Sequence, residues 1–200
     1  MAKFITVWSS KGGVAKTTTA LLLSAFYDSQ NKKVLLYDAD EQRSAFKTVT
    51  KSDQYQFDTT TDLESLDTSQ YDYVISDIPP RLMLLSKRQR QTVRGSDVIV
   101  VPQSPGRLDY ESVKSMDDEL KNVPVIHLLT KVDGRSANDK RIASGFAKDW
   151  LKMGLLEVYK NVVNESVNLF SKNASKYSNV SRARKEVRAI AQLVEKKMRN

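Results

Sequence analysis

Short, almost continuously apolar segments recur along the chain, and this pattern constrains the fold more than any other feature. The segments are 3–8, 32–40, 71–80, 96–105 and 123–133. Strands that are covered on both faces have such apolar cores. Helical patterns lie at 16–31, 82–94, 108–121, 137–152, 165–171 and 180–198. Strands alternating with helices predict an α/β fold, a mostly parallel twisted sheet flanked by helices on both faces.

The composition narrows the class of protein. The 200 residues are 40% hydrophobic and 28% charged, as in ordinary globular proteins, and we expect one domain over 1–200. No apolar run is long enough to span a membrane, and the first residues lack a signal-peptide pattern, so we expect a cytoplasmic protein. The absence of cysteine excludes disulfides and iron–sulfur clusters, and the single His127 argues against a histidine-built metal site.

Polar residues follow several of the predicted strands. A glycine-rich loop comes after the first strand, Asp38 and Asp40 end the second, Asp77 ends the third, and TKVD (130–133) ends the last. In sheets of this kind, ligands bind at the carboxyl ends of the strands. We therefore expect these residues to converge on one edge of the sheet.

The loop at residues 9–20 reads SSKGGVAKTTTA and lies between a predicted strand and a predicted helix. The common phosphate-loop pattern needs glycines where this chain has Ser10 and Ala15. Gly12 and Gly13 nevertheless allow close backbone approach, and N–H groups at the start of a helix form an anion site. We expect Lys16 to neutralise the β- and γ-phosphates of a nucleotide. We expect the Thr17 hydroxyl to ligate Mg²⁺.

The stretch KGGVAKTT resembles the deviant Walker A motif, K-G-G-x-x-K-[ST], of the ParA/MinD family of ATPases. The resemblance runs over essentially the whole chain. It implies a P-loop protein that binds ATP and Mg²⁺ and forms a homodimer on ATP. The implied nucleotide-binding residues in the loop are Lys11, Gly12, Gly13, Val14, Ala15, Lys16, Thr17 and Thr18. Lys11 is the signature residue, which would cross the dimer interface and offset the repulsion between two nucleotides.

Two further motifs carry the predicted catalytic and metal residues. VLLYDADEQRS (34–44) resembles the family's D-x-D-P-Q motif, with Glu41 replacing the proline. The resemblance implies that Asp40 positions or activates the attacking water and that Asp38 lies near the metal. YVISDIPP (73–80) resembles Walker B, so Asp77 would hold Mg²⁺ through a water. The predicted catalytic set is Lys11, Lys16, Asp38 and Asp40, and the predicted metal set is Thr17, Asp38 and Asp77.

The segment LLTKVDGRS (128–136) leaves the base ambiguous. We predict that Thr130, Lys131 and Asp133 belong to the nucleotide-binding site, where a carboxylate such as Asp133 can accept two hydrogen bonds from guanine. Thr-Lys-x-Asp also resembles the guanine-reading motif of the signal-recognition GTPases, and family members usually have an asparagine near Thr130 that contacts adenine. The DIPPR segment here differs from the D-T-A-G-R of those GTPases, which also lack a lysine such as Lys11. ATP is therefore favoured.

The charge of the chain is unevenly distributed. Residues 1–130 carry 16 Lys+Arg and 17 Asp+Glu, a net of −1, whereas residues 131–200 carry 16 and 7, a net of +9. This asymmetry predicts a polyanionic partner. The resemblance implies non-specific DNA binding by the ATP-bound dimer, and we assign it to Arg182, Arg184, Lys185 and Arg188. A second basic cluster would serve DNA or a protein partner: Arg81, Lys87, Arg88, Arg90 and Arg94.

The implied function is a slow ATPase stimulated by an adaptor of ParB type or a cargo-linked equivalent. It would associate with the nucleoid and position a plasmid or an assembly such as a carboxysome. No helix-turn-helix precedes the first strand, so operator binding is not expected. Alternatives are a MinD-like membrane-cycling ATPase, a signal-recognition-type GTPase and a synthetase of the dethiobiotin type. A membrane role is disfavoured because the last helix lacks Phe and Trp, and its apolar stripe is expected to pack onto the domain.

Overall fold

The computed structural model describes residues 1–80, 86–107 and 110–199. In this part of the chain seven strands form one sheet in the order β3-β2-β4-β1-β5-β6-β7, and all neighbouring strands are parallel. The strands are β1 (Lys3–Val7), β2 (Val34–Asp38), β3 (Asp58–Thr60), β4 (Tyr73–Asp77), β5 (Val98–Gln103), β6 (Val125–Val132) and β7 (Leu151–Gly154). The helices are α1 (Lys16–Asp28), α2 (Ser44–Thr50), α3 (Lys87–Arg94), α4 (Tyr110–Leu120), α5 (Ala137–Ser144), α6 (Glu157–Asn164) and α7 (Val180–Lys197).

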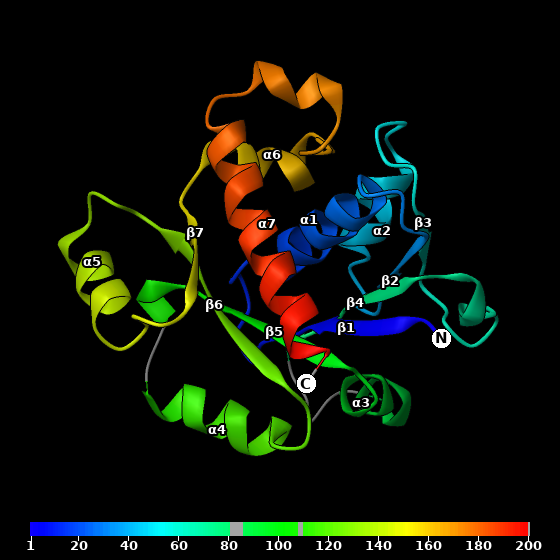
Figure 1. Cartoon of the computed structure of the whole chain (residues 1–200). Coiled ribbons are helices and arrows are strands. Elements are labelled where there is room, and N and C mark those ends of the chain that lie inside the picture. The colour runs from blue at the N-terminus through cyan, green and yellow to red at the C-terminus, as the bar shows by residue number, and fades with distance from the viewer. Residues whose placement is uncertain (81–85, 108–109, 200) are drawn as a thin grey trace.

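Helices cover both faces of the sheet, as Figure 1 shows. One face carries α1, α2, α6 and α7, whose apolar side chains form one core cluster with the strands. The other face carries α3 and α4, whose Val93, Met116 and Leu120 join a second cluster. The predicted fold class, a mostly parallel sheet between two helical layers, is confirmed.

Strand β5 shows why the apolar segments are nearly continuous. Val98 and Val100 belong to the core under α1 and α7, whereas Ile99 and Val101 belong to the core under α3 and α4. Successive side chains of a strand point to opposite faces, so a strand covered on both sides needs apolar residues at every position.

Two predicted helices are wrong in whole or in part. The helix expected over 137–152 ends at Ser144, where Gly145 is the C-cap, and residues 151–154 form the edge strand β7. No helix forms over 165–171. Ser166 has a left-handed φ of 51°, and the alternate residues Val167 and Leu169 enter the core instead. Sequence reasoning also missed the short elements α2, β3 and α6.

The remaining predicted helices correspond to α1, α3, α4 and α7, with shifted ends. Parts of two of these predictions, 82–85 and 108–109, lie outside the described residues, as does Arg81.

Candidate nucleotide-binding and active site

The glycine-rich loop joins β1 to α1 and closes on itself. Gly13 has a φ of 71°, and Ala15, the N-cap of α1, has a φ of 69°. These left-handed positions turn the chain sharply at the start of the helix. The Lys16 ammonium donates to the Lys11 carbonyl at 3.1 Å and so spans the loop. The loop thus has the shape of an anion cradle at the positive end of α1.

The end of β6 fastens the loop from one side. The Lys131 ammonium donates to the Gly13 carbonyl at 2.7 Å. The buried Thr130 hydroxyl lies 3.0 Å from the Val14 carbonyl and 3.1 Å from the Gln103 carbonyl. Lys131 has a left-handed φ of 57°, which marks the point where the strand pattern breaks. In this structure Thr130 and Lys131 therefore hold the loop, and contact of either with a base stays a prediction.

Asp77, at the end of β4, lies against the start of α1. Its carboxylate accepts a hydrogen bond from the Thr17 hydroxyl at 2.7 Å. Burial raises the pKa of Asp77 to about 7, partly offset by the Thr17 hydrogen bond. Burial lowers the pKa of Lys16, against the attraction of Asp77 and Asp40. A buried carboxylate beside a hydroxyl is a site where a cation would stabilise the ionised form.

Asp38 and Asp40 shape a tight turn after β2. The buried Asp38 carboxylate accepts the backbone N–H groups of Asp40 at 3.1 Å and Phe46 at 2.9 Å. Burial raises its pKa, and these N–H groups oppose the rise. Asp40 lines a cavity beside the glycine-rich loop, and its carboxylate accepts the Gln42 N–H at 3.0 Å. Asp38 therefore holds the turn, and Asp40 presents a carboxylate to the cavity.

The oxygen donors fit Mg²⁺. No cluster of three or more His, Cys, Asp or Glu that could cage a metal occurs within the part of the chain described. Mg²⁺ commonly binds through one or two protein oxygens together with substrate phosphates and water. The Thr17 hydroxyl and the Asp77 carboxylate are such donors, beside the phosphate cradle. Each Asp38 oxygen accepts one backbone N–H and keeps a second lone pair, and a metal contact by Asp38 stays a prediction.

A cavity of about 540 Å³ opens beside the loop. Gly12, Gly13 and Ala15 to Thr18 line one side, with Asp40, Thr130 and Lys131. The opposite wall comes from β7 and α6, and sequence reasoning missed it: Met153, Gly154, Leu155, Leu156, Tyr159, Lys160, Val163 and Asn164. No polar motif marks this wall in the sequence. Its mixed apolar surface suits the flat face of a nucleobase, whereas the loop side suits phosphates.

Glu186 of α7 fixes this second wall. Its carboxylate accepts the Gly154 N–H at 3.0 Å and the Tyr159 hydroxyl at 2.8 Å. The Arg182 guanidinium pairs with the same carboxylate at 2.9 Å. The last helix thus holds the far side of the cavity in place, a link that no sequence motif indicated.

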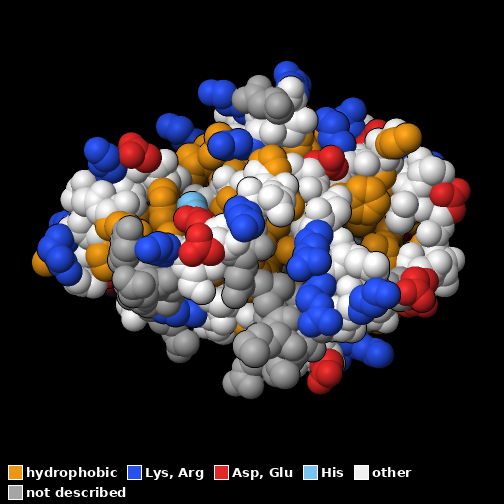
Figure 2. Space-filling view, turned by 90° about the horizontal axis from the view of Figure 1, so that it is seen from below, with side chains coloured by type: hydrophobic (Ala, Val, Ile, Leu, Met, Phe, Trp, Pro, Cys, Tyr) orange, Lys and Arg blue, Asp and Glu red, His pale blue; other side chains and the backbone are white. Residues whose placement is uncertain are grey.

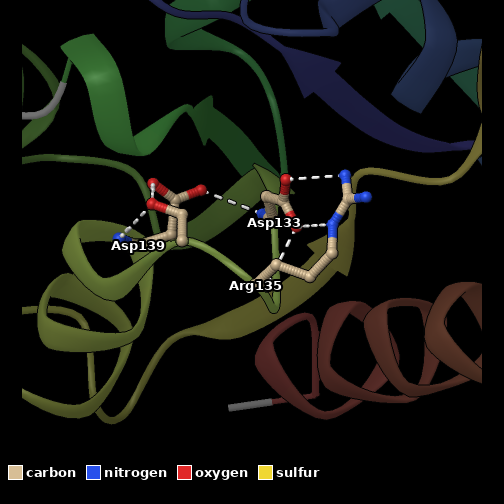
Figure 3. Close-up of polar contacts among 4 residues, drawn as sticks. Asp133, Arg135 and Asp139 are labelled. Atoms are coloured by element: carbon tan, nitrogen blue, oxygen red, sulfur yellow. Dashed lines mark hydrogen bonds and ion pairs between the residues drawn. The ribbon is translucent and has the colours of Figure 1, made fainter.

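Asp133 follows the cavity-lining residues Thr130 and Lys131 closely in sequence, but its carboxylate is bonded to Arg135. Figure 3 shows its two carboxylate oxygens facing the Arg135 side chain. The Arg135 side-chain nitrogens donate to these oxygens, each at 3.0 Å. The Arg135 hydrogen bonds lower the pKa of Asp133. The Asp133 N–H donates to Asp139. Asp133 is not among the residues that line the cavity in the described chain, so a base contact by Asp133 remains a prediction.

The four residues predicted to bind DNA have different surroundings on α7. The Arg184 guanidinium donates to the carbonyls of Leu169 at 2.8 Å and Ser171 at 3.0 Å, and Arg182 pairs with Glu186. Lys185 and Arg188 are exposed. The stripe of Val187, Ile190, Ala191 and Val194 is buried in the core, as expected. Among the described residues no helix has the length and apolarity to cross a membrane.

Four of the five residues of the second basic cluster belong to α3, and Arg81 lies outside the described residues. Lys87, Arg90 and Arg94 are exposed, and their spacing of i, i+3 and i+7 places them on one face of the helix. Figure 2 views the side of the molecule that α3 and α4 cover and shows Lys and Arg side chains gathered there. The structure leaves both basic surfaces available to a partner.

A parallel sheet with a phosphate cradle at the start of α1, and carboxylates at the neighbouring strand ends, defines a P-loop nucleotide-binding protein. Residues 2–64 match the model of a family described as an AAA domain. The chain is 33% identical over 147 residues to the maintenance of carboxysome distribution protein A of Gloeobacter kilaueensis, covering 68% of this chain and 67% of that protein.

Two other similarities extend further along the chain. The sporulation initiation inhibitor protein Soj of Bacillus subtilis is 24% identical, over 84% of this chain and 87% of Soj. A putative plasmid partition protein of Borrelia burgdorferi, solved bound to AMPPNP, has a TM-score of 0.76 and 19% identity, covering 98% of this chain and all of that chain. The chain belongs to the ParA/MinD family of P-loop ATPases.

Proposed function

We propose that this protein is an ATPase that dimerises on ATP, binds DNA non-specifically and positions a cargo. One observation supports the dimer above others. Gly12, Gly13 and Lys16 line the cavity of their own chain, whereas Lys11 is absent from the described lining. Lys11 directly precedes Gly12 in the loop and is partly exposed. A lysine at that place is suited to reach the nucleotide of a second copy.

The cavity supports ATP hydrolysis with the following division of roles. The loop N–H groups and Lys16 would hold the β- and γ-phosphates, with Lys16 leaving the Lys11 carbonyl for them. Thr17 and Asp77 would hold Mg²⁺, which neutralises charge on the phosphates when bound. Asp40 would orient the attacking water, and Lys11 of the second copy would offset charge that develops in the transition state. The apolar wall from β7 and α6 would contact adenine.

DNA binding is assigned to Lys185 and Arg188, two exposed cations of α7, because Arg182 pairs with Glu186 and Arg184 donates to backbone carbonyls. Lysine and arginine contacts to phosphates are independent of sequence and weaken with salt. A dimer presents each contact twice, so dimerisation would switch DNA affinity strongly. In this way ATP would control attachment to the nucleoid.

The cargo class follows from the relatives. One relative is named for maintaining carboxysome distribution and a solved structure for plasmid partition, so we propose a plasmid or a protein assembly as the cargo. Hydrolysis would be slow and stimulated by an adaptor of ParB type or its cargo-linked equivalent.

The test is the binding of a random-sequence DNA duplex with ATP, ADP, GTP or no nucleotide. We expect binding with ATP only, loss at high salt, and loss in Lys11→Ala. Lys32→Ala, on an exposed turn after α1, is the matched control and should bind as wild type. Equal binding in every nucleotide state would contradict the proposal. Binding to anionic vesicles in place of DNA would support a membrane-cycling ATPase, and preference for GTP would support a GTPase.

A further inference from the structure

Ala39 lies between the two carboxylates of the turn, and both of its backbone groups are bonded to other elements. Its N–H donates to the Asp77 carbonyl at the end of β4, at 3.0 Å. Its carbonyl accepts the side-chain amide of Gln89, in the first turn of α3, at 2.8 Å. Ala39, the residue before Asp40, is therefore bonded both to the end of β4 and to the start of α3.

Both the oxygen and the nitrogen of the Gln89 side-chain amide form hydrogen bonds. The side-chain oxygen accepts the Ser86 N–H at 2.9 Å, and the Ser86 hydroxyl accepts the Gln89 N–H at 3.1 Å. These two bonds form a capping box, which leaves the side-chain nitrogen to donate to Ala39. The amide orientation is thereby fixed, because a flipped amide would place a donor against the Ser86 N–H. The Gln89 side chain therefore joins the start of α3 to the Asp38–Asp40 turn.

We propose that Gln89 is a positioning residue for hydrolysis, which sets the Asp40 carboxylate by holding the Ala39 carbonyl. Asp40 follows Ala39 directly, and its own N–H is held by Asp38. A shift of the Ala39 peptide would therefore rotate the carboxylate that faces the cavity. Misplacement of a reacting group by about 1 Å costs up to roughly 100-fold in rate. This inference rests on the proposed ATPase function and adds α3 to the elements that set its rate.

The decisive variant is Gln89→Glu. Glutamate is a preferred capping-box residue at this position, so the variant keeps the acceptor for Ser86 and the start of α3. It replaces the donor to Ala39 with an oxygen that repels the carbonyl. Gln89→Ala removes both the acceptor for the Ser86 N–H and the donor to the Ala39 carbonyl. Gln91→Ala is the matched control, because it is the same change at an exposed position of the same helix.

The measurements are steady-state ATP hydrolysis, affinity for a fluorescent ATP analogue, thermal unfolding, and hydrogen exchange of the peptide covering 39–43. We expect Gln89→Glu to lower kcat by roughly 10-fold or more, with KM and affinity within about twofold and with no loss of thermal stability. Exchange over 39–43 should quicken in this variant, whereas Gln91→Ala should match the wild type throughout.

The two proposals can fail separately. A wild-type protein that does not hydrolyse ATP would contradict the proposed function, and hydrogen exchange would still decide whether Gln89 holds the turn. Unchanged exchange over 39–43 in Gln89→Glu would overturn the positioning role. So would a wild-type kcat in Gln89→Glu, even if Gln89→Ala were slow, because only the helix cap would then matter.

Discussion

At the scale of single residues, the loop uses its small side chains for different reasons. Gly13 and Ala15 have left-handed φ values of 71° and 69°, so the fold itself demands that conformation. Gly12 lies outside the left-handed region, and a Cβ built there meets nothing within 4 Å. The isolated chain therefore does not need a glycine at 12. A ligand or a second copy that approaches the backbone closely would need one.

We predict that Gly12→Ala changes the free energy of unfolding by less than about 0.5 kcal/mol but weakens ATP-dependent dimerisation at least several-fold. Gly13→Ala is the contrasting variant and should cost about 1 kcal/mol because alanine is strained at positive φ. Chemical unfolding measures the stability of both variants, and light scattering with ATP and Mg²⁺ measures their dimerisation. If Gly12→Ala unfolds as easily as Gly13→Ala, the glycine serves the fold.

The buried Asp77 gives a prediction on pH. Burial raises its pKa to about 7 in the folded, nucleotide-free protein, whereas an unfolded aspartate titrates near 3.8. Between these values only the folded state keeps the proton. The contribution of Asp77 to stability is therefore present below pH 4 and is lost as the pH rises toward 7. The cost arises because burial penalises the ionised carboxylate by more than the Thr17 hydrogen bond and the Lys16 charge offset.

Asp77→Asn removes this titration while preserving an acceptor for Thr17. In the absence of nucleotide and Mg²⁺, the variant should exceed the wild type in stability by roughly 2 to 4 kcal/mol at pH 8 and by much less at pH 5. Urea unfolding at the two pH values measures the difference, and Asp53→Asn on an exposed turn is the control. A constant difference at both pH values would show that Asp77 does not titrate as proposed.

At the scale of elements, hydrophobic pattern predicted the strands that are buried on both faces and the helix with a clear apolar stripe. It failed where the pattern is short or mixed. Trp150 to Met153 continue a run of helix-compatible residues, but residues 151–154 pair with β6 at the edge of the sheet and form β7. Val167 and Leu169 enter the core on either side of the buried polar Asn168, and over three residues that spacing cannot be separated from a helical period.

The basic residues of α7 have different predicted roles: Arg184 stabilises the fold, whereas Lys185 and Arg188 bind DNA. We predict that Arg184→Ala lowers the free energy of unfolding by about 1 to 2 kcal/mol, because it frees the Leu169 and Ser171 carbonyls. Lys185→Ala and Arg188→Ala should leave stability unchanged. They should weaken DNA binding, and each removed cation that binds a phosphate should reduce the log–log salt slope by about 1. Stable variants of both residues that bind DNA normally would move the interface to another surface, such as α3.

At the scale of the whole molecule, the carboxyl edge of the sheet gathers residues from distant parts of the chain. Asp40, Thr17 and Lys131 line one cavity although up to 114 positions separate them in sequence (131 minus 17). The sequence predicted this polar half, because each residue ends a recognisable strand or begins a helix. The β7–α6 wall and the Glu186 network could not be predicted, because they depend on how the last third of the chain folds back onto the loop.

The central claim is an ATP-dependent dimer in which Lys11 of each copy reaches the nucleotide of the other, and molar mass in solution tests it most directly. In an Asp40→Ala background, which should bind ATP but hydrolyse it slowly, light scattering should give twice the 22.6 kDa of one chain with ATP and Mg²⁺. With ADP it should give 22.6 kDa. Adding Lys11→Ala should keep the protein monomeric while ATP still binds. A monomer in ATP, or a dimer that survives the loss of Lys11, would contradict the account.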